Sequence, residues 1–400
     1  MIRLSHRVGS AEPSATLEVA AKARELVGRG IDVVTFATGE PDFDTPRHVR
    51  KAAAEALEAG ATRYPPLAGL PELRQAVVRR MEEDHGLLYS ADQVLVTVGA
   101  KQAIYNLCQA VLEEGDEAVI LAPYWVSYPE VVRLAGAEPV MVPSDFEDGF
   151  VPRLDRIEAS LNENTRLIML NTPSNPAGAV YPRRTLEGLA DLLRCYPKVV
   201  VVTDDIYSRI LFDGGSFENL AMAAPDLRHR IVIVDGVSKA FAMTGWRVGW
   251  AVGPGHLLDP MKLILGQSTS GATTFAQAGA VAALEGDQSV VDEMVAEFSR
   301  RRDHMVSRLE ALEGISCRAP SGAFYALPDV RGLLGRSYGN DRVIASSGDI
   351  ARLLIEEQAV AVVDGAPFGA EGFVRLSFAT SMERIDEGID RIESFVSKLN

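Results

Sequence analysis

Five short apolar runs, four of which end in a polar or glycine-rich segment, constrain the fold of this chain more than any other feature. The runs are Val94–Val98, Ala118–Leu121, Leu167–Leu170, Val199–Val202 and Ile231–Val234. Apart from Thr97, each is apolar throughout, and stretches with helical spacing separate the runs. Strands that are buried on both faces and alternate with helices predict a mostly parallel sheet covered by helices on both sides. The sequence therefore predicts an α/β fold.

The pattern changes beyond about residue 286. A long charged helix is expected over Ser289–Leu312. Further strands are expected at Ala323–Leu327, Val360–Val363 and Phe373–Phe378, with helices between and after them. We expect a large α/β domain over residues 48–288 and a smaller α+β domain built from residues 1–47 and 289–400. Val248–Val252 is predicted as an edge strand of the large sheet.

Composition excludes several classes of protein. The net charge of −15 argues against a nucleic-acid-binding surface, which would be basic. No apolar run approaches the ~20 residues of a membrane span, and Met1–Ser10 precedes no apolar core that would make it a secretion signal. Cys108, Cys195 and Cys317 fit neither a disulfide framework nor a metal site. These features predict a cytoplasmic protein with no bound metal.

Polar residues follow four of the predicted strands. They belong to the segments Gly99–Ala100–Lys101, Asn171–Gly178, Thr203–Tyr207 and Gly236–Lys239. Because ligands of parallel α/β sheets bind beyond the carboxyl ends of the strands, these segments are expected at one edge of the sheet. That edge would carry backbone donors, a carboxylate, a phenol and an amine.

Lys239 and Arg247 indicate the chemistry of this edge. A lysine held where a sheet ends loses hydration and releases its proton more easily. The unprotonated amine condenses with aldehydes. Arg247 lies between Gly245 and Gly249 and offers a forked donor for a phosphate. An aldehyde joined to a phosphate describes pyridoxal 5'-phosphate (PLP).

Residues 236–249, with the sequence GVSKAFAMTGWRVG, resemble the lysine signature of the class I aminotransferases. The resemblance continues across most of the chain. It implies the PLP-dependent transferase fold type I, with Lys239 as the Schiff-base lysine. The implied reaction is ping-pong transfer of an amino group from an L-amino acid to a 2-oxo acid, with 2-oxoglutarate as the expected acceptor. Ala177 and Asp205 depart from the commonest family pattern, but neither is assigned to the chemistry.

The resemblance also implies a cofactor site. Asp204 would keep the pyridine nitrogen protonated, and Asn175 and Tyr207 would donate hydrogen bonds to the phenolate oxygen of the ring. The other residues expected at the cofactor are Gly99, Ala100, Lys101, Trp125, Ser238 and Arg247. Tyr64 matches a tyrosine that reaches the phosphate of the neighbouring subunit, which implies a homodimer.

Substrate recognition is expected to centre on Arg375. This arginine lies in the alternating run Phe373–Phe378, and a guanidinium binds a carboxylate through two parallel hydrogen bonds. The resemblance assigns it to the substrate α-carboxylate, together with the backbone of Gly39 and the side chains of Trp125 and Asn175.

The far end of the substrate is predicted from a second set of residues. Ser14, Thr16 and Lys101 resemble the bacterial aspartate aminotransferases that bind a distal carboxylate without an arginine from the partner subunit. An aspartate-type donor is therefore favoured. Glu12, however, stands where a basic residue would help to bind an acidic substrate.

Other functions remain open from the sequence. The amino donor could instead be aromatic or basic, or the same scaffold could act as a PLP-dependent lyase, decarboxylase or oxidase. A PLP-binding regulator would need a further DNA-binding domain, and a dinucleotide enzyme would need a G-x-G-x-x-G motif after a strand; neither is found. The sequence does not identify the donor or the pathway.

Overall fold

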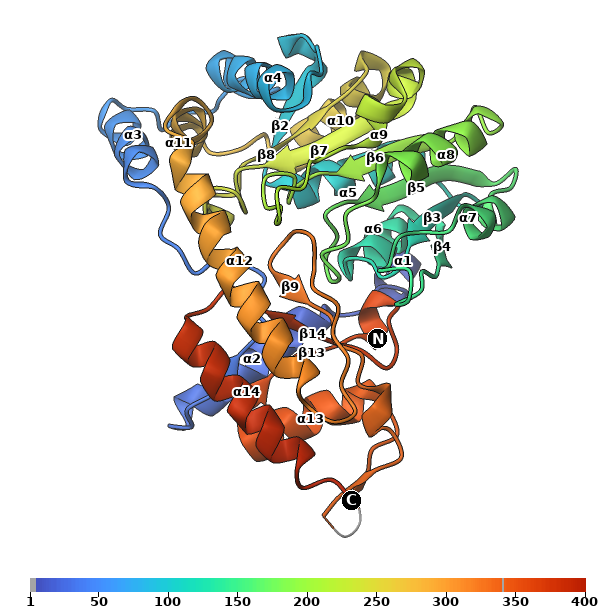
Figure 1. The fold of residues 1–400 in the computed structure, drawn as a ribbon. Helices are drawn as coiled ribbons and strands as arrows, with labels where there is room; N and C mark the ends of the chain where they lie inside the picture. The colour runs from blue at the N-terminus through green and yellow to red at the C-terminus, as the bar shows by residue number, and fades with distance from the viewer. Residues whose placement is uncertain (1–4, 340–341) are drawn as a thin grey trace.

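The computed structural model describes residues 5–339 and 342–400 and is organised around a seven-stranded sheet (Figure 1). In spatial order its strands are β2 (Val94–Thr97), β8 (Gly249–Val252), β7 (Ile231–Gly236), β6 (Val200–Asp204), β5 (Thr165–Asn171), β3 (Glu117–Leu121) and β4 (Glu138–Val142). Neighbouring strands from β7 to β4 pair in parallel. The prediction of a mostly parallel α/β sheet is confirmed.

The predicted position of Val248–Val252 is wrong. β8 lies inside the sheet, between β2 and β7, and pairs antiparallel with both. Gly249 lies opposite Gly236 in this pairing. A Cβ at Gly249 would collide with the backbone of Gly99 and Ala100, so glycine lets the strand fit into the interior. β2 and β4 form the edges instead.

Helices cover both faces of the sheet, as the uniformly apolar strands require. Leu167 and Met169 face one side and pack in the same cluster as helices α5 (Ala100–Val111), α6 (Ser127–Ala135) and α10 (Gly255–Ser268). Ile168 and Leu170 face the other side, in a cluster with helices α4 (Pro71–His85), α7 (Leu154–Ser160), α8 (Arg183–Arg194), α9 (Leu220–Ala223) and α11 (Thr274–Glu285). The core therefore fixes the position of every strand end.

The two ends of the chain meet in a second, smaller region. There, β1 (Val34–Thr35) pairs in parallel with β12 (Val360–Ala361), and β14 (Val374–Ser377) lies between β13 (Val363–Asp364) and β9 (Tyr325–Ala326). Its helices are α2 (Ala15–Gly28), α13 (Ser347–Gln358) and α14 (Met382–Val396). The domain boundaries given above stay a prediction.

Helix α12 (Ser289–Glu310) connects the two regions, running from beside α11 to α14 (Figure 1). The predicted long charged helix is thus present. The other α-helices and strands are α1 (His6–Gly9), α3 (Arg47–Glu58), β10 (Ser337–Tyr338) and β11 (Arg342–Val343). Among the described residues, no helix combines the length and apolar character that crossing a bilayer requires. Cys108 and Cys317 are buried free thiols, and Cys195 is an exposed one.

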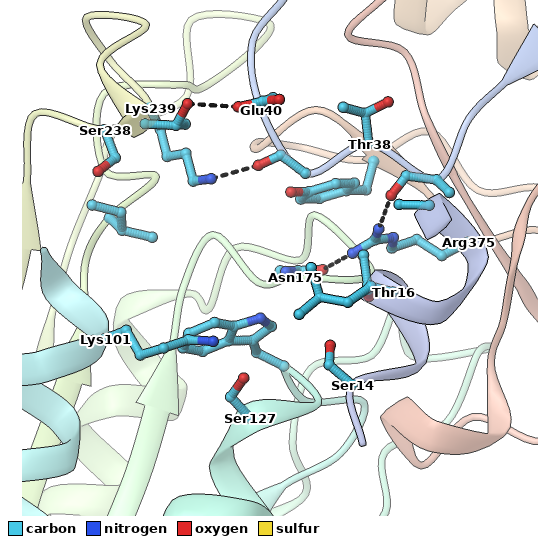
Figure 2. A pocket seen from close by; sticks show the side chains of 18 of the residues that line it. Ser14, Thr16, Thr38, Glu40, Lys101, Ser127, Asn175, Ser238, Lys239 and Arg375 are labelled. Carbon is cyan, nitrogen blue, oxygen red and sulfur yellow. Dashed lines mark hydrogen bonds between the residues drawn. The ribbon is translucent and has the colours of Figure 1, made fainter. Parts of the chain in front are cut away.

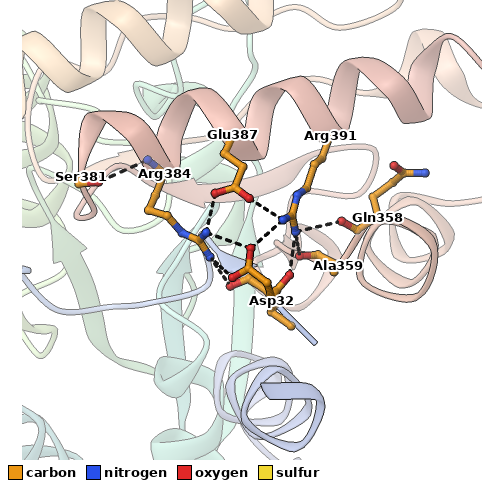
Figure 3. Close-up of polar contacts among 8 residues, drawn as sticks. Asp32, Gln358, Ala359, Ser381, Arg384, Glu387 and Arg391 are labelled. Carbon is orange, nitrogen blue, oxygen red and sulfur yellow. Dashed lines mark hydrogen bonds and ion pairs between the residues drawn. The ribbon is translucent and has the colours of Figure 1, made fainter. Parts of the chain in front are cut away.

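Ion pairs connect Asp32, just before β1, to helix α14 (Figure 3). The Asp32 carboxylate accepts hydrogen bonds from Arg384 Nη2 at 3.0 Å and Arg391 Nη2 at 2.8 Å. Glu387 lies between the two arginines and pairs with both. Arg391 also donates to the backbone carbonyl oxygens of Asp32 and Ala359. This cluster ties the N-terminal segment to the end of the chain.

Replacing Asp32 with asparagine should lower the melting temperature by about 1–2 °C at pH 7, the scale of an exposed ion pair. Hydrogen bonding to Arg384 lowers the pKa of Asp32. Its contribution is therefore present above the ordinary carboxyl pKa of about 4 and is lost as the pH falls through the lowered value. In calorimetric melts from pH 7 to 3, the melting temperatures of the wild type and of Asp32→Asn should converge as the pH falls. Asp148→Asn, which removes an exposed carboxylate without an ion pair among the described residues, is the matched control.

Candidate active site

A cavity of about 720 Å³ opens at the carboxyl edge of the main sheet (Figure 2). Its walls come from the N-terminal segment, the loops after β5, β6 and β7, the start of α5, and strands β9 and β14. The predicted site residues that line it are Ser14, Thr16, Gly39, Ala100, Lys101, Trp125, Asn175, Asp204, Tyr207, Ser238, Lys239, Arg247 and Arg375. Gly99 and Tyr64 are not part of its lining.

Lys239 follows β7 and reaches into this cavity. Its Nζ donates a hydrogen bond to the backbone oxygen of Gly39 at 2.5 Å. The rings of Tyr207 and Phe324 lie 5.9 and 5.8 Å from the amine. Burial lowers the pKa of Lys239 to about 8, partly opposed by the charge of Glu40. A useful fraction of the amine is therefore unprotonated near neutral pH.

This lowered pKa predicts how Lys239 reacts in the cofactor-free protein. Competitive labelling with acetic anhydride should show acylation of Lys239 rising with pH around a midpoint near 8, because only the neutral amine reacts. Added N-acetyl-lysine, with the ordinary lysine pKa of about 10.4, serves as the internal reference. Mass spectrometry of the peptide that contains residue 239 measures the midpoint. A midpoint close to that of the reference would show that the amine is fully hydrated.

Asp204 ends strand β6 and lies at the base of the cavity. Its side chain is 4% exposed, and Oδ2 accepts a hydrogen bond from the Tyr128 hydroxyl at 2.7 Å. Burial raises the pKa of Asp204 to about 6, and the bond from Tyr128 opposes this rise. A buried carboxylate of this kind is suited to a cationic hydrogen-bond donor. Tyr128 was not predicted, because one tyrosine in an apolar helix gives no signal of a distant partner.

The start of helix α5 and Arg247 form a site suited to an anion. Gly99 adopts a φ of +78°, and a Cβ at this position would lie 2.6 Å from Arg247 Nη2. Glycine thus lets the guanidinium approach the first N–H groups of α5, which have no partner within the helix. Arg247 Nη1 donates to the oxygen of Thr244 at 2.9 Å. No carboxylate in the described part of the chain pairs with Arg247. Gly99 therefore shapes the site without lining the cavity.

Arg375 is a buried cation whose polar partners are all neutral. It is 1% exposed, donating from Nη1 to Asn175 Oδ1 at 3.0 Å and from Nη2 to the Ala37 oxygen at 2.9 Å. Its Nε has no partner, and the Tyr325 ring lies 4.5 Å from the guanidinium carbon. Burial lowers the pKa of Arg375. Since isolated buried charges are costly, this arrangement favours an anionic ligand in the cavity.

Asn175 and Tyr207 keep donors available to a ligand. Because Asn175 Oδ1 accepts from Arg375, its Nδ2 remains a donor. The hydroxyls of Tyr207 and Tyr325 lie 2.9 Å apart, so either of them donates to the other. Tyr325 also lines the cavity and was missed. Its signal was the pairing of its strand with that of Arg375, which is evident only once β9 and β14 are placed together.

The residues expected to bind the distal group lie on two sides of the cavity (Figure 2). Ser14 and Thr16 lie at the start of α2, and Thr16 Oγ1 has no hydrogen-bond partner. Lys101 Nζ lies 4.7 Å from the centre of the Trp125 ring. Glu12 is exposed and does not line the cavity; its backbone N–H bonds to Glu130.

Tyr64 lies on the surface of the protein. Its side chain is 89% exposed and lies outside the cavity. Its predicted role across a subunit interface therefore stays a prediction.

The sequence model of the family described as aminotransferase class I and II matches residues 31–392. An aspartate/prephenate aminotransferase from Nitrosomonas europaea is 42% identical over 99% of this chain and 100% of its own. The crystal structure of the Rhizobium meliloti aspartate aminotransferase is 38% identical, with a TM-score of 0.97 over 100% of both chains. The Thermus thermophilus aspartate aminotransferase with maleate is 41% identical, with a TM-score of 0.91 over 99% of this chain and 100% of the other.

Proposed function

Because the chain belongs to the family of class I and II aminotransferases and is therefore a transaminase, we propose that it moves the amino group of an aspartate-type L-amino acid to a 2-oxo acid, with 2-oxoglutarate as acceptor and PLP as cofactor. One observation carries this proposal. The lysine with a lowered pKa, the buried carboxylate and the buried guanidinium all face one cavity. These are the groups needed to move a proton, hold a cationic ring and fix a carboxylate.

The residues present fit PLP. The glycine-dependent approach of Arg247 to the start of α5 suits a phosphate, and the buried Asp204 carboxylate suits a protonated ring nitrogen. We assign the phosphate to the backbone N–H groups of Ala100 and Lys101 and to Ser238 and Arg247, with Gly99 shaping the loop, and the ring to Asp204, Asn175, Tyr207 and Trp125. Lys239 would supply the amine that bonds to the aldehyde carbon. When bound, PLP supplies an electron sink for negative charge developing at the substrate α-carbon.

The side chains of this protein supply the orientation and the proton transfer. Arg375, with Gly39 beside it, fixes the α-carboxylate of the amino acid through two parallel hydrogen bonds. This leaves the α-carbon facing Lys239. With a pKa of about 8, the Lys239 amine accepts the α-proton and later returns a proton, as general base and then general acid. The rings of Tyr207 and Phe324 lie near this amine.

We assign the distal carboxylate of the donor to Ser14, Thr16 and Lys101. The unpartnered Thr16 hydroxyl and the Lys101 amine near Trp125 support this assignment. The names of the relatives, aspartate aminotransferase and aspartate/prephenate aminotransferase, favour a dicarboxylic donor. They also place prephenate among the acceptors to be tested.

We further propose a homodimer in which Tyr64 enters the partner's site. The high exposure of Tyr64 and the nearby exposed Leu67 support this arrangement. Light scattering of the purified protein measures its mass directly. A cytoplasmic location stays a prediction from the composition.

A screen of amino donors against 2-oxoglutarate tests the proposal. The expected result is glutamate formation that is fastest with aspartate and is matched by loss of the donor, without release of ammonia. A second series uses aspartate with prephenate and phenylpyruvate as acceptors. Ammonia or carbon dioxide release without amino transfer would replace the proposal by a lyase or decarboxylase, and a preference for basic donors would overturn the aspartate-type assignment.

A further inference from the structure

Helix α2 forms an apolar wall of the cavity with one cation in it. Leu17, Ala20, Ala23 and Val27 line the cavity, and Arg24 lines it among them. Thr16, Ala20 and Arg24 are spaced four residues apart and therefore share one face of the helix. The wall thus continues from the hydroxyl of Thr16 through small apolar residues to a guanidinium.

Arg24 differs from the neighbouring cations on the same helix. Lys22 pairs with Glu25 at 3.1 Å, and Arg29 pairs with Glu25 at 3.6 Å. Within residues 5–339 and 342–400, Arg24 has no ion pair, and no hydrogen bond of its side chain is found. An arginine that lines a cavity while its neighbours are paired is available to an anion that enters the cavity.

Helix geometry places the Arg24 side chain beyond the residues assigned to the distal carboxylate of aspartate. Eight residues separate Thr16 from Arg24, which corresponds to about 12 Å along the helix axis. Long side chains on a helix lean back toward its N-terminus, so the guanidinium is directed toward the Thr16 end. Arg24 is exposed and lines the cavity on its α2 side, so its guanidinium is open to the end of a longer side chain.

The other charges of the cavity are already in use. Arg375, Arg247, Lys239 and Lys101 have assigned roles, and the carboxylate of Glu40 accepts a hydrogen bond from the Thr244 hydroxyl at 2.7 Å. Glu12, whose charge opposes acidic substrates, lies outside the cavity lining. Arg24 is thus the remaining cation on the wall that faces the substrate side chain.

We propose that Arg24 is a specificity-determining residue that binds the distal carboxylate of amino and oxo acids longer than aspartate, of five carbons or more. The inference rests on the proposed function and names a further substrate contact for it. Ser14, Thr16 and Lys101 bind the shorter dicarboxylate, and Arg24 extends the range to the longer one. Ping-pong transfer between aspartate and 2-oxoglutarate requires one site to bind both a four-carbon and a five-carbon dicarboxylate.

Two measurements on the PLP-loaded protein test this inference, with Arg24→Gln as the main variant because it removes the charge and keeps a polar side chain. The first is kcat/KM for aspartate, glutamate and 2-aminoadipate. The ratio of 2-aminoadipate to aspartate should fall about fivefold, the scale of an exposed ion pair. In Arg24→Lys, which keeps the charge, this ratio should fall less than in Arg24→Gln. Lys22→Ala, on the same helix but outside the cavity lining, should keep the wild-type ratio.

The second measurement is calorimetric binding of succinate, glutarate and adipate, which carry no amino group and do not react. Arg24→Gln should weaken adipate and glutarate more than succinate. Equal ratios in variant and wild type, in either measurement, would overturn the role of Arg24. If the wild type transferred no amino group from any donor, the proposed function would fail, whereas the calorimetric series would still decide whether Arg24 binds the longer dicarboxylates.

Discussion

Replacement of Lys239 by alanine is expected to lower the turnover of the PLP-loaded protein by about four orders of magnitude. The substitution removes the amine that reaches into the cavity and whose pKa burial lowers to about 8. No other described lysine except Lys101 lines this cavity, and Lys101 lies over Trp125. Stopped-flow measurement of single turnovers with aspartate gives the rate of the chemical step directly.

The Lys239→Ala variant also tests whether residue 239 is the point at which PLP attaches to the protein. After treatment with PLP and borohydride, the wild-type peptide that contains residue 239 should carry a pyridoxyl group, and the variant should carry none. Lys198→Ala, which removes an exposed lysine outside the cavity, should label at residue 239 and turn over as the wild type does. Native turnover by Lys239→Ala would refute the assignment of the catalytic amine.

Arg375→Lys should lower kcat/KM for all α-amino acids by about 10²- to 10³-fold. A lysine replaces two parallel charge-assisted hydrogen bonds by a single point charge, and a loss of about 3–4 kcal/mol corresponds to this factor. The effect should appear mainly in KM, because the carboxylate is bound in the ground state as well as in the transition state. Inhibition by simple monocarboxylates should weaken in parallel.

A buried arginine also holds the fold, so this prediction needs a matched control. Arg230 is 6% exposed and donates to the backbone oxygens of Leu193, Tyr196 and Val199, away from the cavity. Arg230→Lys should lower the melting temperature without changing the KM of the donor. If both variants lost stability and activity to the same degree, Arg375 would have a structural role only.

Most of the main sheet could be predicted from the sequence, because strands buried on both faces are apolar throughout. Leu167–Leu170 is the clearest case, since its alternate residues enter two different cores. The place of β8 could not be predicted in this way. An interior antiparallel strand and an edge strand look alike in a single sequence, and only the contact of Gly249 with the start of α5 separates them.

The site was predictable where it follows strand ends and unpredictable where it depends on distant packing. Lys239, Asp204 and Asn175 come after strands of one sheet, so topology alone brings them together. Tyr128, Tyr325 and the backbone oxygen of Ala37 come from elements that meet only in the folded chain. Hydrogen bonds between residues 76 to 338 positions apart leave no local pattern in the sequence.

The parallel pairing of β1 with β12 joins two strands that are synthesised at very different times. About 325 residues lie between Thr35 and Val360. At about 5–20 residues per second, the ribosome needs roughly 16–65 s to deliver the partner strand. All seven strands of the sheet that carries Lys239 and Asp204 are thus synthesised well before Arg375. During synthesis, the residues proposed to hold the ring and the aldehyde of the cofactor are present before the arginine proposed to bind the amino acid.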